Sequence, residues 1–180
     1  MRAILLTLQF LLFSGFAFAD CNPESLLQAA AGQWAGQGAG EQTTFEGKLS
    51  GPSQPWSFLA GKITGLNGFN YQVLVAKNRS VATGLSNYSL KLTELNRNVS
   101  FDFMLTDCVA NKGLLIFSRV KSESRTPVEI RTVDMFQLTI SGAKLRIAFE
   151  GADVYCSDAN STTKLCGSGA YSFRDLNKKL

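Results

Sequence analysis

The residues that could carry chemistry in this chain are four cysteines and a set of scattered carboxylates, because the sequence contains no histidine. Histidine is the commonest general base and a frequent zinc ligand. Its absence excludes Ser-His-Asp and Cys-His nucleophilic sites. Zinc sites made from cysteine alone need closely spaced pairs, which the four cysteines do not form. We therefore predict no metal and no cofactor.

Paired carboxylates are the remaining catalytic option, because two of them can hydrolyse a glycosidic bond. No spacing links any two of the available acids to one pocket, and carboxylates on strands normally face solvent. We predict a protein that is not an enzyme, with a carboxylate-based hydrolase as the weaker alternative. The acids on or near predicted strands are Asp102, Glu129, Asp134, Glu150 and Asp153.

The first nineteen residues have the pattern of a secretory signal peptide. Arg2 is their only charge, an apolar run follows from residue 3 to residue 13, and Ala17-Phe18-Ala19 fits signal peptidase. The competing interpretation, a transmembrane helix, is disfavoured because Gln9 and Ser14 interrupt a run that should reach about 20 apolar residues. We predict a signal peptide over 1–19, one domain over 20–180, and a secreted or periplasmic protein that does not span a membrane after cleavage.

An exported chain meets an oxidising environment, so its even number of cysteines favours two disulfides. Three pairings are possible. We favour Cys156 with Cys166, which closes a short loop, and Cys21 with Cys108, which pins the N-terminal segment to the rest of the domain.

The charge balance argues against a nucleic-acid partner. The chain has 18 Lys and Arg against 14 Asp and Glu, and the basic residues are scattered along it. Binding along a phosphate backbone needs a clustered basic face.

The elements that would position any site are one short helix and a series of strands. Asn22-Pro23-Glu24 provides a helix N-cap, a proline at the first helical position and an acid in the first turn, and the helix can run to Gly32. Thereafter apolar and polar residues alternate, most clearly in residues 69–76, 99–106 and 144–150. Such alternation is typical of a sheet with one buried face.

Turn residues separate these segments and make neighbouring strands antiparallel. Asn67-Gly68 and Ser141-Gly142 lie between apolar segments and suit tight hairpins, and residues 77–79, 96–98 and 111–113 mark further turns. With almost no helix to cover strand edges, the sheet is best closed on itself. The predicted fold is all-β, an antiparallel up-and-down barrel of 8–10 strands with a short N-terminal helix; a two-sheet sandwich is the alternative. Strand glycines, Gly36, Gly47 and Gly61 among them, are candidate bends.

Three residues carry a family resemblance. Gly32 and Trp34 open the first predicted strand after the helix, and Arg174 lies in the last. This layout resembles the calycin superfamily, lipocalins in particular. In that family the tryptophan closes the barrel base and a basic side chain packs across its ring. The resemblance therefore implies structural roles for these three residues, although Thr106-Asp107-Cys108 departs from the family's Thr-Asp-Tyr signature.

The predicted function is the binding of a small hydrophobic or amphipathic ligand inside the barrel, and each inward side chain could instead serve only the core. The main alternative is a protein-binding module, such as a secreted or periplasmic protease inhibitor on a lipocalin-like barrel. A small outer-membrane barrel is a third. The candidate inner-face residues are Phe69, Tyr71, Phe101, Phe103, Phe136, Leu138, Leu145, Ile147 and Phe149.

Overall fold

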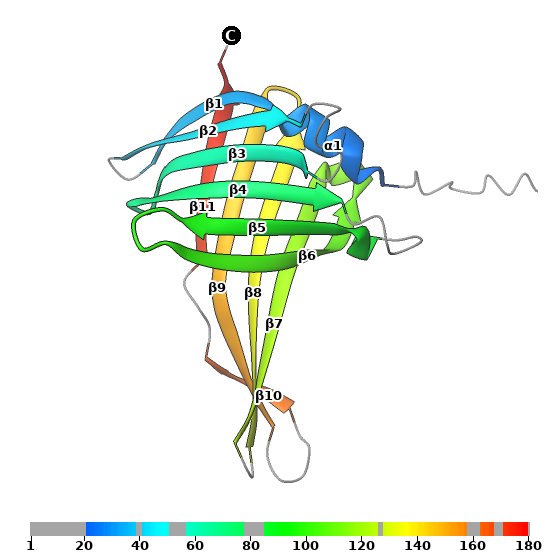
Figure 1. Cartoon of the computed structure of the whole chain (residues 1–180), viewed down its shortest axis with the longest axis vertical. Helices are drawn as coiled ribbons and strands as arrows, with labels where there is room; N and C mark the ends of the chain where they lie inside the picture. Colours follow the sequence, from blue (N-terminus) through cyan, green and yellow to red (C-terminus); the bar gives the residue numbers. More distant parts are fainter. Residues whose placement is uncertain are drawn as a thin grey trace, which may run out of the picture.

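The computed structural model describes residues 21–38, 41–50, 57–77, 85–125, 128–157, 163–167 and 171–179 (Figure 1). The predicted signal peptide and the loop at 51–55 lie outside these ranges. The helices are α1 (Pro23–Ala30) and two 3-10 turns, η1 (Leu85–Asn87) and η2 (Ala110–Lys112). The strands are β1 (Gly32–Gly38), β2 (Glu41–Leu49), β3 (Ser57–Leu66), β4 (Phe69–Lys77), β5 (Tyr88–Glu94), β6 (Val99–Val109), β7 (Leu114–Arg125), β8 (Val128–Ser141), β9 (Lys144–Ser157), β10 (Thr163–Gly167) and β11 (Tyr171–Lys178).

The strands form a closed antiparallel barrel of ten strands. Strands β1 to β9 pair with their sequence neighbours, and β11 lies between β9 and β1 and completes the circle. Strand β10 pairs only with β9, outside the circle. The predicted all-β barrel with a short N-terminal helix is confirmed.

The barrel consists of two groups of strands, β1 to β6 in one and β7, β8, β9 and β11 in the other. Two short pairings join the groups, β6 with β7 and β1 with β11. The pairs between β6 and β7 run from Met104–Ser118 to Val109–Leu114, and β1 meets β11 only at Trp34–Lys178 and Ala35–Asn177. Both junctions lie toward α1, and away from it the two groups cross at a steep angle (Figure 1). We call the end that carries α1 the helix end, and the end with the β3–β4 and β5–β6 turns the far end.

Three strands extend past the barrel wall. Residues 120–125 of β7 pair with β8 only, and β8 and β9 stay paired up to Glu129–Ser157. The resulting arm, completed by β10, points away from the barrel (Figure 1). Cys156 of β9 and Cys166 of β10 form a disulfide with Cα atoms 5.9 Å apart, which confirms this predicted pair.

The helix begins as the sequence predicts. The Asn22 side-chain Oδ1 accepts hydrogen bonds from the backbone N–H groups of Glu24 (3.0 Å) and Ser25 (3.3 Å), which have no partner inside the helix. Leu27 and Ala30 are fully buried, so the apolar side of α1 covers the barrel interior.

The turns also follow the predicted chemistry. Asn67 and Gly68 both have positive φ, at 53° and 77°, as a two-residue hairpin of the primed type requires. Gly142 has φ 58° and begins the β8–β9 turn, which therefore lies one residue later than predicted. These hairpins fix which residues of each strand point inward.

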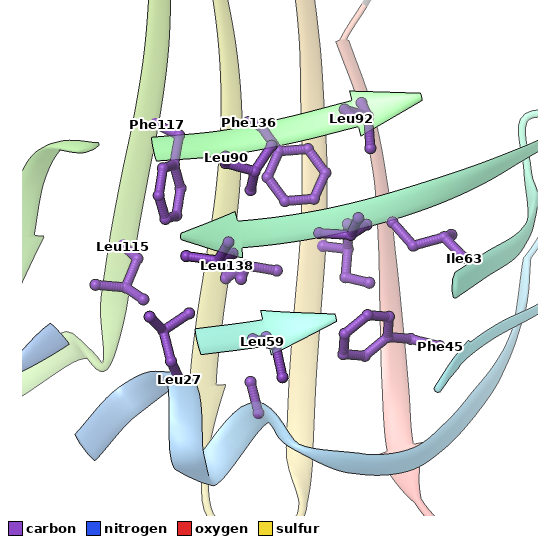
Figure 2. Packing of buried hydrophobic residues seen from close by; sticks show 14 of the residues in the cluster. Leu27, Phe45, Leu59, Ile63, Leu90, Leu92, Leu115, Phe117, Phe136 and Leu138 are labelled. Carbon is purple, nitrogen blue, oxygen red and sulfur yellow. The ribbon is translucent and has the colours of Figure 1, made fainter. Parts of the chain in front are cut away.

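The core lies inside the barrel, where alternate side chains of every wall strand meet (Figure 2). Val99, at the far-end tip of β6, is an exception to the predicted alternation, with 42% of its surface exposed. Two of the strand glycines have a packing role: Gly47 and Gly61 are cross-strand partners, and a Cβ on either would meet the ring of Phe45 at 3.0 Å or less.

Candidate functional site

The predicted inner-face residues do face the interior, and they fall into two groups. Six are buried members of the core: Tyr71, Phe103, Phe136, Leu138, Leu145 and Ile147. The other three, Phe69, Phe101 and Phe149, pack against the core but remain partly exposed. These three lie toward the far end, so the inner face is less completely covered there.

Trp34 lies in the interior at the helix end, and its cationic neighbour differs from the prediction. The indole is fully buried, and its Nε1 donates to the Ala30 carbonyl at 2.9 Å. The cation over its ring is Lys178, with Nζ 5.4 Å from the centroid. The register explains this, because Lys178 is the direct partner of Trp34, whereas Arg174 lies four residues earlier, opposite Ile147.

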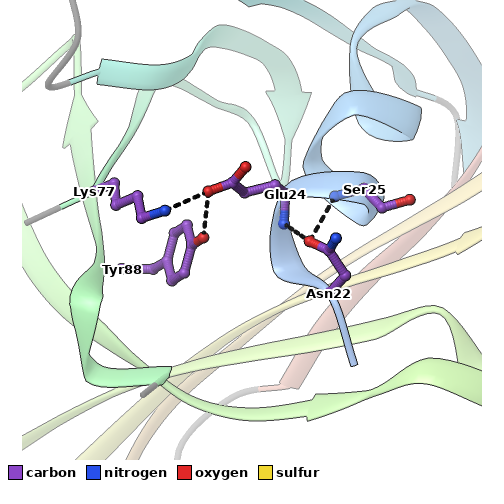
Figure 3. A network of polar contacts seen from close by, with 5 residues as sticks. All are labelled: Asn22, Glu24, Ser25, Lys77 and Tyr88. Atoms are coloured by element: carbon purple, nitrogen blue, oxygen red, sulfur yellow. Dashed lines mark hydrogen bonds and ion pairs between the residues drawn. The ribbon is translucent and has the colours of Figure 1, made fainter. Parts of the chain in front are cut away.

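A polar network holds the start of α1 against the barrel rim (Figure 3). The Glu24 carboxylate accepts from Lys77 Nζ at 2.5 Å and from the Tyr88 hydroxyl at 2.9 Å. These two hydrogen bonds lower the pKa of Glu24, and the bond to Glu24 raises the pKa of Lys77. Burial raises the pKa of Tyr88.

A disulfide adds a covalent anchor at the same end. Cys21, immediately before the helix cap, is bonded to Cys108 near the end of β6, with Cα atoms 5.7 Å apart. This confirms the second predicted pair. Together with the buried Leu27 and Trp34, this disulfide holds α1 against the barrel.

The far end is built differently, around a partly exposed aromatic cluster. The ring of Phe149 lies 6.3 Å from that of Phe101 and 6.4 Å from that of Phe103, the latter edge-on. The guanidinium of Arg119 lies over both β6 rings, 4.9 Å from Phe101 and 5.6 Å from Phe103. Apolar rings and a cation therefore lie together at the far end of the barrel.

Arg119 is also ion-paired with Asp134, its direct partner on β8. The Arg119 Nε lies 2.7 Å from the Asp134 carboxylate, and its Nη2 contacts the same oxygen. The side chains are only 17% and 7% exposed. A pair this buried needs its hydrogen bonds to offset desolvation, so it is a fixed feature of the far end.

A second charged pair lies at the β5–β6 turn. Glu94 is buried, and Arg97 Nε lies 3.5 Å from its Oε1, which makes an ion pair without a hydrogen bond. The Arg97 guanidinium also covers the ring of Phe69 at 5.2 Å. Burial, followed by the charge of Glu94, raises the pKa of Tyr71, the cross-strand partner of Glu94.

Arg174 faces the same interior from β11. Its partner Ile147 is fully buried, and cross-strand partners share one face of a sheet. Arg174 Nη1 donates to the Phe173 carbonyl at 2.8 Å, while its Nε is buried and has no hydrogen-bond partner among the described residues.

Sequence reasoning did not place Arg119 or Glu94 at the far end, and it named Asp134 only among acids expected to face solvent, although the position of each in its strand's alternation was readable. Asp134 continues the inward series of Phe136 and Leu138, and Glu94 continues that of Leu92. A charge in phase with buried apolar residues is the signal that could have found them.

Asp134 is held by Arg119 and Asp102 is exposed, so these two proposed acids do not share a pocket. Within the described ranges, no three His, Cys, Asp or Glu residues come together as a metal site. No helix in those ranges is long and apolar enough to cross a membrane. The side chains of Glu129 and Asp153 lie outside the described part.

Comparison with known proteins identifies no relative. No family model, curated protein or solved structure matches this chain. The resemblance to lipocalins therefore stays a prediction, and the function must be argued from the barrel itself.

Proposed function

We propose that this chain is an exported, non-catalytic barrel that binds a small amphipathic molecule at the far end of its interior. The observation that carries the proposal is the cluster of Phe101, Phe103 and Phe149, of which Phe101 and Phe149 are partly exposed, next to the buried Arg119–Asp134 pair. Apolar walls with a few fixed polar groups are typical of small-molecule sites.

The contrast in burial supports entry at this end. Wall residues near α1, such as Leu115 and Trp34, are completely buried, and α1 is held there by a disulfide and an ion pair. At the far end Phe101 and Phe149 keep exposed surface. Covering that surface with a ligand would contribute about 25 cal/mol per Å².

Export is supported by the cysteines. All four are paired in the structure, and disulfides persist in oxidising compartments. A secreted or periplasmic location agrees with the signal-like pattern of residues 1–19.

The test is a titration of the oxidised protein with phenylnaphthylamine, a neutral apolar dye whose fluorescence rises on burial. We expect saturable binding, and roughly 3- to 10-fold weaker binding by Phe101→Ala because part of the wall is lost. Phe173→Ala is the matched control, since Phe173 is on the outer face of β11 with 46% exposure. Absence of saturable binding would contradict the proposal.

One observation favours the protein-binding alternative. Residues 120–125 of β7 pair only with β8, so the other edge of this segment has no strand partner among the described residues. An exposed edge can accept a strand from another protein. Capture of a stoichiometric protein partner by the wild-type chain, lost with Ser122→Pro and unaffected by Phe101→Ala, would favour this function.

A further inference from the structure

One arginine that faces the interior at the far end has no ion-pair partner among the described residues. Asp134 is paired with Arg119, and Glu94 with Arg97. Arg174 is the remaining inward guanidinium, and no carboxylate among the described residues pairs with it. Arg97 lies on the exposed β5–β6 turn, so the contrast within the interior is between the paired Arg119 and the unpaired Arg174.

The hydrogen bonds of Arg174 show which of its donors lacks a partner. Nη1 is engaged by the Phe173 carbonyl, whereas Nε is buried without an acceptor. The edge formed by Nε and Nη2 can grip a carboxylate through two parallel hydrogen bonds. A buried donor without an acceptor is costly, so it needs an explanation in function.

On the side of β9, the surroundings of Arg174 are apolar. Its partner Ile147 is fully buried, and Phe149, two residues further along β9, belongs to the aromatic cluster. A molecule held at Arg174 by an acidic group could place its hydrocarbon part against Phe149 and Phe101.

We propose that the ligand is an amphipathic organic acid whose anionic group is bound by Arg174. This inference rests on the proposed function and adds the chemical class of the ligand. Arg174 was expected to pack on Trp34, and Lys178 takes that place, so Arg174 is available for a ligand.

The experiment measures displacement of phenylnaphthylamine from the oxidised protein by decanoate and by decanol, which share a chain length and differ in charge. We expect decanoate to bind roughly 10- to 100-fold more tightly, as a charge-assisted hydrogen bond in a buried site allows. Arg174→Gln should remove this preference by weakening decanoate while leaving decanol unchanged. Arg174→Lys should retain part of it.

The matched control is Arg146→Gln. Arg146 is an arginine of the neighbouring strand β9, but it is exposed and ion-paired with Asp175 at 2.6 Å. The substitution Arg146→Gln removes the same charge from the outer surface, and we expect the preference for decanoate over decanol to remain. Circular dichroism of each variant verifies the fold.

The outcomes separate the two proposals. An equal decanoate preference in wild type and Arg174→Gln, with the dye still bound, would overturn the anionic ligand and leave the proposed function standing. Displacement of the dye by inorganic phosphate as strongly as by decanoate would also overturn the amphipathic acid. If neither dye, decanoate nor decanol binds the wild type, the proposed function fails, and this inference fails with it.

Discussion

The two ends of the barrel are made from the same strands, but they differ in how many of their polar groups have partners. At the helix end the indole N–H of Trp34 and the carboxylate of Glu24 have close partners and a disulfide fixes the helix, and only Asn87 Oδ1, beside Tyr88, is buried without a partner among the described residues. At the far end the Arg174 Nε is buried without a partner and the Glu94 Oε1 lacks a hydrogen bond. Satisfied groups stabilise a fold, whereas unsatisfied groups await a ligand or weaken it.

The largest expected difference between the ends is in core substitutions. Trp34→Ala should lower the free energy of unfolding by about 3–5 kcal/mol, because a fully buried ring and its hydrogen bond are both lost. Phe101→Ala should cost about 1–2 kcal/mol, because Phe101 is only partly buried. Urea denaturation of the oxidised proteins measures both, and equal costs would contradict the comparison.

The two disulfides should also differ. Removing Cys21–Cys108, with a sequence separation of 87, should cost about 4 kcal/mol, and removing Cys156–Cys166, with a separation of 10, about 1–2 kcal/mol less. Longer loops lose more entropy when they are closed in the unfolded chain. Paired Cys→Ser variants compared by thermal unfolding measure this; the reverse order would show that the short pair also holds the arm to the barrel.

At the far end a substitution should have the opposite sign. Arg174→Met replaces a partly buried, incompletely bonded cation by an apolar side chain of similar length, and we expect it to raise the free energy of unfolding by about 1 kcal/mol. Urea unfolding without ligand measures the change. A loss of stability similar to that of a core truncation would mean that Arg174 is structural.

The smallest effect concerns the Glu24 network. Because hydrogen bonds from Lys77 and Tyr88 lower the pKa of Glu24, its contribution is present above the unfolded-state pKa near 4.5 and is lost as the pH falls through the lower folded value. The pair is exposed, so Glu24→Gln should cost about 0.5 kcal/mol at pH 7. Unfolding of the wild type and of Glu24→Gln at pH 7 and at pH 3 measures this contribution. A stability difference as large at pH 3 as at pH 7 would contradict the role given to the Glu24 carboxylate.

Much of the fold was readable from the sequence because its signals are local. Asn22 and Pro23 start the helix, Asn67-Gly68 makes a hairpin, and the alternation around Phe103 and Ile147 identifies the inner face. The cysteine pairs were also predicted, since each choice joined segments with a plausible structural role.

The candidate site was only half predicted, because it depends on register between strands distant in the sequence. Whether Arg174 or Lys178 reaches Trp34 is decided by the pairing of β1 with β11, and no local pattern fixes that pairing. Likewise, the Arg119–Asp134 pair arises from the β7–β8 register. The aromatic residues were predicted from alternation, and the charges beside them were not.

The most direct test of the far end as the binding end is an NMR titration of the isotope-labelled, oxidised protein with decanoate. The account predicts saturable shift changes at Phe101, Phe149 and Arg174, with little change at Trp34 and Tyr88. Changes concentrated around Trp34 and α1, with none at Phe149 or Arg174, would contradict it.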